Sequence, residues 1–124
     1  MATSYKVLGQ TKVATGGTPV VLYTATPTGS TIQTIVSTIT ICNTNSTQST
    51  YRIAVVPSAT SQSDAQAITT LGTDLKYYLV YDAIVAAKET VSYTIGLTVD
   101  TYDKILVNSG TTGVTFAAFG SETQ

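Results

Sequence analysis

Seven carboxylates are the side chains of this sequence that could act as general acids, general bases or cation ligands: Asp64, Asp74, Asp82, Glu89, Asp100, Asp103 and Glu122. Asp82 and Glu89 flank one predicted turn, and a glycosidase needs two carboxylates that face each other across a cleft. Asp100 and Asp103 flank another predicted turn, and with loop carbonyls they could form a weak Ca²⁺ site. Carboxylates at turns usually cap backbone N–H groups, and we expect that structural role here.

The sequence has no histidine and one cysteine, Cys42. Histidine is the commonest catalytic base and metal ligand, so its absence removes every Ser-His or Cys-His pair. A lone cysteine forms neither an internal disulfide nor a thiolate zinc site by itself. The glycines form neither GxGxxG nor GxxxxGK, so phosphate binding is not supported. We therefore expect no enzyme activity, no cofactor and no metal.

Eight tyrosines are the more promising functional residues. Tyr77 and Tyr81 fall on the apolar phase of a predicted strand, where the expected role is core packing or cross-strand pairing. Tyr78 falls on the polar phase, and exposed tyrosines are favoured at protein interfaces. We predict Tyr78 as an interface residue, together with Tyr5 and Tyr102. Exposed aromatic rings can also stack against sugars, which keeps a carbohydrate-binding function open.

Composition restricts the class of protein. A length of 124 residues suits a single domain over residues 1–124. Only 10% of residues are charged and the net charge is −1, so there is no basic surface for nucleic acid. Apolar runs reach only about five residues, far fewer than the roughly 20 that cross a bilayer, so we expect no membrane partner. The opening MATSYKVLGQ has no apolar run typical of a targeting segment.

The chain contains 26 Thr, 13 Val and 9 Ile, which together exceed a third of its residues. These β-branched side chains favour strands because they lose rotamer freedom in a helix. Apolar and polar residues alternate, most clearly at 91–99, where the odd positions are apolar. Strands are predicted at 5–8, 19–24, 31–42, 51–55, 75–82, 91–99, 104–108 and 114–119. About eight antiparallel strands at this spacing predict an all-β, single-domain β-sandwich of jelly-roll-like type.

Residues 31–42 break the alternation. Ile35, Ile39 and Ile41 share one face, but Ile32 and Val36 fall on the other. A bulge near Thr34, or burial of both faces, accounts for this change of phase.

Two connections carry further expectations. Residues 58–74 form the longest loop, in which Ser63 or Asp64 could cap a helix of two turns, although a mobile loop explains the composition equally well. Long loops in compact domains often bind partners. The letters NSGTTG join the last two predicted strands, 104–108 and 114–119, and favour a tight hairpin.

A surface made of Thr, Ser, Asn and Gln favours assembly, because burying a hydroxyl costs far less than burying an unpaired charge. Scarce charges also leave strand edges unprotected against pairing with another chain. We therefore expect a homo-oligomer, a trimer.

Three stretches resemble a group of small virion proteins of tailed phages that infect cyanobacteria and other marine bacteria. They are the opening MATSYKVLGQ, the middle ITICNTNSTQSTYRIAVVP, and the end KYYLVYDAIVAAKETVSYTIGLTVDTYDKILVNSGTTGVTFAAFGSE. The resemblance covers most of the chain, with 58–74 the least typical part, and it includes no active-site residues. It implies an accessory β-sandwich protein on the capsid, neck or tail.

The expected function is therefore that of a non-enzymatic structural protein of a phage virion, made in the host cytoplasm. Its expected partners are copies of itself and other capsid or tail proteins. The alternative is a module that binds carbohydrate on the host surface through Tyr78 and the loops.

Overall fold

The computed structural model of the chain describes residues 3–29 and 31–124. Within these residues the chain forms eight strands, one α-helix and one short 3₁₀-helix. Their bounds are β1 (Thr3–Lys12), β2 (Val20–Thr24), β3 (Gln33–Asn43), β4 (Ser49–Val56), α1 (Asp64–Leu71), η1 (Leu75–Tyr77), β5 (Tyr78–Val85), β6 (Thr90–Val99), β7 (Lys104–Ser109) and β8 (Val114–Thr123). Each predicted strand has a counterpart, but the strand predicted at 75–82 begins only at Tyr78, because Leu75–Tyr77 form the 3₁₀-helix η1.

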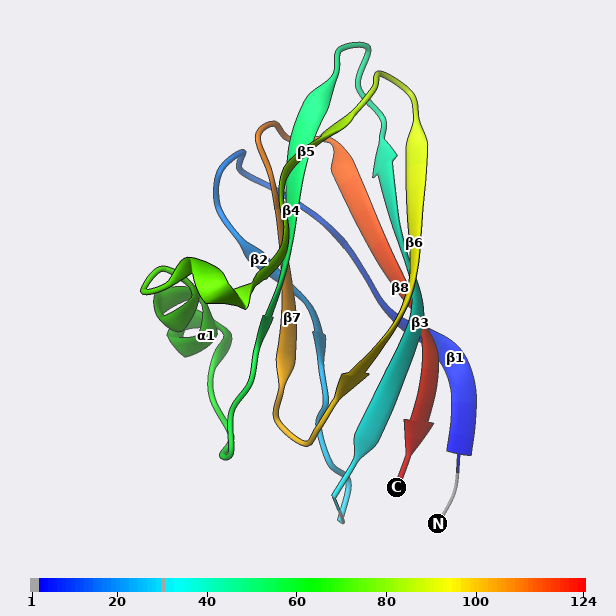
Figure 1. Cartoon of the computed structure of the whole chain (residues 1–124), viewed down its shortest axis with the longest axis vertical. Coiled ribbons are helices and arrows are strands. Elements are labelled where there is room, and N and C mark those ends of the chain that lie inside the picture. The colour runs from blue at the N-terminus through cyan, green and yellow to red at the C-terminus, as the bar shows by residue number, and fades with distance from the viewer. Residues whose placement is uncertain (1–2, 30) are drawn as a thin grey trace.

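The strands form two antiparallel sheets of four that pack face to face (Figure 1). The first sheet has the order β1-β8-β3-β6, and the second has the order β2-β7-β4-β5. Chain neighbours thus alternate between sheets through most of the sequence, as in the jelly rolls of viral capsid and lectin domains. The predicted all-β sandwich with jelly-roll-like topology is confirmed.

The predicted hairpin of the last two strands is wrong. β7 lies between β2 and β4 in the second sheet, whereas β8 lies between β1 and β3 in the first. All six residues of β7 are buried, so this strand needs a neighbour on both sides and a cover on both faces. The connection 110–113 crosses between the sheets instead of turning back within one, and Gly113 takes a φ of +86° there.

The core lies between the sheets and consists of their inward-facing aliphatic and aromatic side chains. In β3, Val36, Ile39 and Ile41 are fully buried in it, but Ile35 is 51% exposed on the outer side. The reason is a break in register between Val36 and Thr38, so the bulge that the sequence predicted near residue 34 lies at Ser37.

Helix α1 provides the cover for the outer side of the second sheet. Ser63 Oγ accepts from the Gln66 N–H in the first turn, and the Ser63 N–H donates to Gln66 Oε1, so the two residues form a capping box. Ala67 and Leu71 of the helix pack in a second apolar cluster with buried residues of β4 and β7. Segment 58–74 therefore contains the two-turn helix that its sequence allowed.

A buried lysine holds this helix to the sandwich. The Lys104 side chain is 5% exposed, and its Nζ lies 3.0 Å from Asp64 Oδ1 at the start of α1 and 2.8 Å from Thr24 Oγ1. The buried ammonium of Lys104 is thus paired with Asp64 and Thr24 and has a structural role. No helix in residues 3–29 and 31–124 is long and apolar enough to cross a bilayer.

Candidate interaction surfaces

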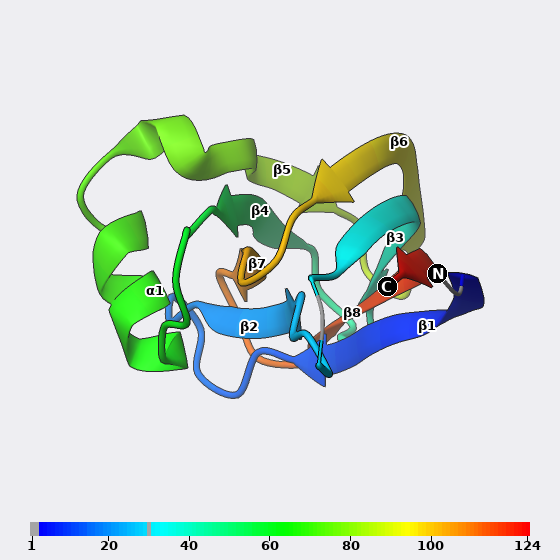
Figure 2. The ribbon, with the colours of Figure 1, turned by 90° about the horizontal axis from the view of Figure 1, so that it is seen from below.

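The outer side of the first sheet lacks the cover that α1 gives to the second. Figure 2 shows the helix on one side of the sandwich and only strands on the other. Two rows of paired residues, each with two apolar members, run across this bare side. Tyr5, Ser121, Ile35 and Thr98 pair in one row, and Val7, Phe119, Thr38 and Thr94 pair in the next. We call the patch formed by Tyr5, Val7, Ile35 and Phe119 the uncovered face.

The uncovered face is unusual for a surface because its apolar residues are contiguous and substantially exposed. Tyr5 is 85% exposed, Ile35 51% and Val7 49%. The remaining members of the two rows are serine and threonine, so no charged side chain lies in them. Contiguous apolar surface on a small protein marks a site of protein contact.

The position of Ile35 on this face follows directly from the bulge at Ser37. One extra residue in β3 reverses the direction of the side chains that precede it, since side chains alternate along a strand. Without the bulge Ile35 would point into the core with Ile39, which is what the alternation in the sequence indicated. The bulge therefore places Ile35 on the surface of the first sheet instead of in the core.

A second apolar surface follows β5, the edge strand of the second sheet. Leu79 and Tyr81 are each 50% exposed, Ile84 is 61% exposed, and Leu75 in η1 is 68% exposed. The sequence had placed the odd positions of this strand on the buried phase and Tyr78 on the solvent phase. That phase is wrong, because Tyr78 packs partly buried against the apolar cluster beneath α1.

Breaks in the pairing of β5 with β4 explain this reversal. Ala54 pairs with Tyr78 and Ile53 with Val80, so Leu79 is an extra residue without a partner on β4. Such a bulge on an edge strand turns its side chain outward and protects the edge from orderly pairing.

A second break places two β5 residues beside the single arginine of the chain. Asp82 adopts a left-handed conformation, with φ 55°, and it forms a bidentate ion pair with Arg52. Asp82 Oδ1 accepts from Arg52 Nε at 2.6 Å, and Asp82 Oδ2 accepts from Nη2 at 3.1 Å. The Arg52 guanidinium holds the pKa of the Asp82 carboxyl below its usual value.

Aromatic rings surround the same arginine. The guanidinium carbon of Arg52 lies 4.0 Å from the ring centroid of Tyr81, a cation–π contact. The rings of Tyr78 and Tyr81 meet edge to face, with centroids 5.0 Å apart. Arg52, Tyr78, Tyr81 and Asp82 therefore form one ordered cluster on the outer side of the second sheet.

This cluster borders a pocket of about 270 Å³. The pocket lies on the part of the second sheet that α1 leaves uncovered. It is lined by Gly17, Thr50, Tyr51, Arg52, Asp82, Asn108, Ser109 and Gly110. The β1–β2 loop forms one wall and is held there by the Gly17 N–H, which donates to the Ser109 carbonyl at 2.8 Å.

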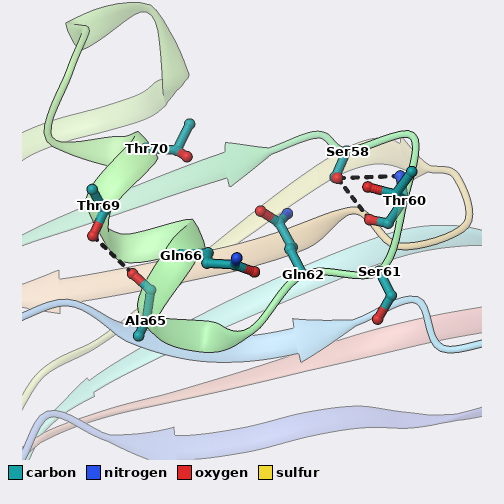
Figure 3. A pocket seen from close by; sticks show the side chains of 8 residues that line it. All are labelled: Ser58, Thr60, Ser61, Gln62, Ala65, Gln66, Thr69 and Thr70. Carbon is teal, nitrogen blue, oxygen red and sulfur yellow. Dashed lines mark hydrogen bonds between the residues drawn. The ribbon is translucent and has the colours of Figure 1, made fainter.

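A larger but more open pocket of about 560 Å³ lies beside α1 (Figure 3). Its walls are hydroxyl and amide side chains of the 58–74 segment, several of which hydrogen-bond to that segment. Ser58 Oγ donates to the Thr60 carbonyl at 2.7 Å, and Thr69 Oγ1 donates to the Ala65 carbonyl at 3.0 Å. The lining includes neither a charged nor an aromatic side chain, so it offers little chemistry for a specific ligand.

The three predicted interface tyrosines lie in different environments and are not brought together. Tyr5 is the most exposed of them and lies on the uncovered face. Tyr78 is partly buried within the arginine cluster. Tyr102 is partly buried in the β6–β7 turn with a φ of +73°, and its N–H donates to the Ala25 carbonyl at 2.8 Å.

The paired carboxylates do not form a catalytic cleft. Asp82 is engaged by Arg52, while Glu89 Oε1 accepts the Ala86 N–H at 3.0 Å within its own turn. Capping is the role that the sequence predicted for carboxylates at turns, and Glu89 confirms it.

Asp100 and Asp103, the second pair of carboxylates, also cap backbone N–H groups. Asp103 accepts from the Asp100 N–H at 2.9 Å and from the Ser58 N–H at 3.0 Å, and Asp100 accepts from the Thr101 N–H at 2.8 Å. Within residues 3–29 and 31–124, no three His, Cys, Asp or Glu side chains gather as a metal site would require. Cys42 is partly buried in β3.

Polar contacts between the sheets lie near the edges of the sandwich. Tyr51 and Tyr93 join the two sheets through their hydroxyls at 2.5 Å. Elsewhere, Tyr23 of the second sheet donates to Glu122 of the first, and Lys6 Nζ lies 2.5 Å from Glu122 Oε1. These contacts fix the separation of the sheets where the aliphatic core ends.

The environment of Glu122 changes its ionisation. Burial opposes the charge, but the hydrogen bonds from Lys6 and Tyr23 outweigh burial and lower the Glu122 pKa below its ordinary value of 4.5. Burial together with the nearby carboxylate raises the pKa of Tyr23 above its ordinary value. At neutral pH the contact is therefore a carboxylate that accepts from a neutral phenol and an ammonium.

We predict that Glu122→Gln weakens the fold at neutral pH and reduces its sensitivity to acid. Since the folded-state pKa of Glu122 is lowered, its charge contributes stability that is present above pH 4.5 and is lost as the pH falls through the lowered value. Urea unfolding should show a loss of about 1–2 kcal/mol in the variant near neutral pH. The two proteins should converge in acid, and a pH-independent difference would contradict the assignment.

The sequence indicated neither of the two surfaces directly. Arg52 is the sole arginine, which is the signal that could have drawn attention to it, but its partners on β5 depend on the bulge at Asp82. Ile35 was assigned to the core because alternation assumes an unbroken strand.

Comparison with known proteins gives a fold likeness. No protein-family model matches the sequence, and no curated protein is similar to it at a significant level. A chain in a structure of infectious bursal disease virus, Gx strain, matches 98% of this chain with a TM-score of 0.52 and 12% identity. The chain spans 32% of the length of that viral chain. At this identity the likeness supports the β-sandwich fold.

Proposed function

We propose that the chain is a non-enzymatic structural protein of a virus particle, an accessory component of a tailed phage that decorates the capsid or belongs to the neck or tail. The motifs that resemble small phage virion proteins support the phage assignment. The jelly-roll topology, and the likeness to a chain of a virus structure, agree with a role in a virion. The carboxylates form ion pairs and caps, which supports a structural role for them.

The uncovered face is the observation that carries this proposal, and its occupant is a second copy of the chain. Tyr5, Val7 and Ile35 expose apolar surface without a charged neighbour in their rows, so burial of this surface meets no uncompensated charge. β1 is also an edge strand of the first sheet, so one of its sides has no hydrogen-bonded strand as a neighbour.

The apolar surface along β5 supplies a second, different contact. Leu79 and Ile84 lie on β5, which forms one edge of the second sheet, while β2 forms its other edge. A contact between two different patches is heterologous and closes into a ring when its rotation allows. A ring of three copies is the assembly that we propose, with further virion proteins bound around it.

Particles purified from the culture that produces the chain provide the test. Mass spectrometry should find the chain at a constant ratio to the major capsid protein, and immunogold labelling should place it at one location on intact particles. A chain that is present in the lysate and absent from washed particles would overturn the proposal.

A further inference from the structure

The pocket beside Arg52 has the features of a binding site that lies apart from the uncovered face. It lies on the outer side of the second sheet, whereas the uncovered face lies on the outer side of the first. A contact through the uncovered face therefore does not cover the pocket, and the proposed contact along β5 reaches only its margin at Tyr81. A site of about 270 Å³ is just below the range of drug-sized pockets and suits a ligand of one small ring.

The charges of the pocket cancel each other. Arg52 and Asp82 form a bidentate pair, so the pocket presents one positive and one negative group at a fixed separation. Of the five N–H donors of a guanidinium, this pair takes two, and the carboxylate oxygens retain lone pairs. Asp82 would repel an anion and Arg52 would repel a cation. A neutral molecule with adjacent hydroxyls can instead donate to Asp82 and accept from Arg52.

Asn108 adds a polar side chain to the lining of the pocket. Its side chain lines the pocket from β7 and is only 5% exposed. Asn108 Oδ1 accepts the Ser109 N–H at 2.8 Å, which fixes the orientation of the amide. Among the described residues Nδ2 has no acceptor, so the amide keeps its N–H donors for a group in the pocket.

An aromatic ring lies next to these polar groups. Tyr81 is half exposed, and the Arg52 guanidinium lies against its ring. Sugars combine hydroxyls with apolar C–H faces, and they are recognised by planar polar side chains close to an aromatic surface. We propose that this pocket binds one residue of a neutral carbohydrate, with Arg52, Asp82 and Asn108 as the hydrogen-bonding groups and Tyr81 at its margin.

A glycan array that carries neutral, sialylated and sulfated glycans, probed with the purified chain, tests this proposal. We expect binding to neutral glycans, followed by calorimetric titration with the methyl glycoside of the sugar that the bound glycans share. Arg52→Lys keeps the charge but loses the bidentate geometry, and it should weaken binding by about tenfold or more. Asn108→Ala should have a similar effect.

Thr69→Ala is the matched control, because it removes a hydroxyl from the other pocket, beside α1. This variant should bind as the wild type does. The proposal is overturned if the folded wild type binds no neutral glycan or only anionic ones, or if neither pocket variant weakens binding. The mass of the oligomer is measured on the same samples, so failure of carbohydrate binding is distinguishable from failure of assembly.

Discussion

Ile35→Asp should dissociate the assembly into monomers that remain folded. Ile35 belongs to the uncovered face and is 51% exposed, so the monomer tolerates a carboxylate there with a change of about 0.5 kcal/mol or less. In the assembly, the same carboxylate would be buried against an apolar neighbour without a partner. Leaving one charge unpaired in a contact costs about 3 kcal/mol or more, which weakens association by a hundredfold or more.

Sedimentation velocity at micromolar concentration is the appropriate measurement. Val7→Asp on the same face should act in the same direction, whereas Thr69→Asp on the exposed side of α1 should leave the sedimentation coefficient unchanged. If both face variants sediment as the wild-type assembly does, the uncovered face is not the contact between copies.

Gly120→Ala should cause the largest loss of stability among the single substitutions considered. A Cβ at this position would lie 2.0 Å from the Ile35 carbonyl oxygen and 3.0 Å from Val36 Cα. Both are backbone atoms of the neighbouring strand β3, so no side-chain rotation relieves the overlap. We expect a loss of about 3 kcal/mol or more in the free energy of unfolding, measured by urea denaturation.

Gly72→Ala is the control for this substitution. A Cβ on Gly72, at the end of α1, meets its nearest atom at 3.5 Å, and its φ of −73° suits any residue. Its stability should stay within about 1 kcal/mol of the wild type and can rise, because alanine restricts the unfolded chain. Equal stability of both variants would show that β3 and β8 do not approach as closely as the bulge at Ser37 requires.

Local patterns in the sequence predicted the strands, because β-branched runs and alternation depend on neighbours a few residues apart. For segment 58–74 they offered Ser63 or Asp64 as a helix cap and left a mobile loop equally open, and the structure shows that Ser63 caps α1. The sheet to which each strand belongs could not be predicted from such local patterns. The letters between β7 and β8 suit a hairpin, and only the burial of β7 on both faces shows why it stays in the other sheet.

The candidate surfaces were less predictable because bulges create them. One extra residue at Ser37 moves Ile35 out of the core, and the extra residues on β5 turn Leu79 outward and bring Asp82 to Arg52. Alternation locates a phase change only approximately, as the three-residue error in β3 shows. The conformation of Asp82, with φ 55°, has no local signal comparable to a glycine.

Multi-angle light scattering of the purified wild-type chain at micromolar concentration tests most directly whether the uncovered face holds copies together. The expected result is a single species with three times the 12.9 kDa mass of one chain. A monodisperse species of 12.9 kDa at every concentration would contradict it.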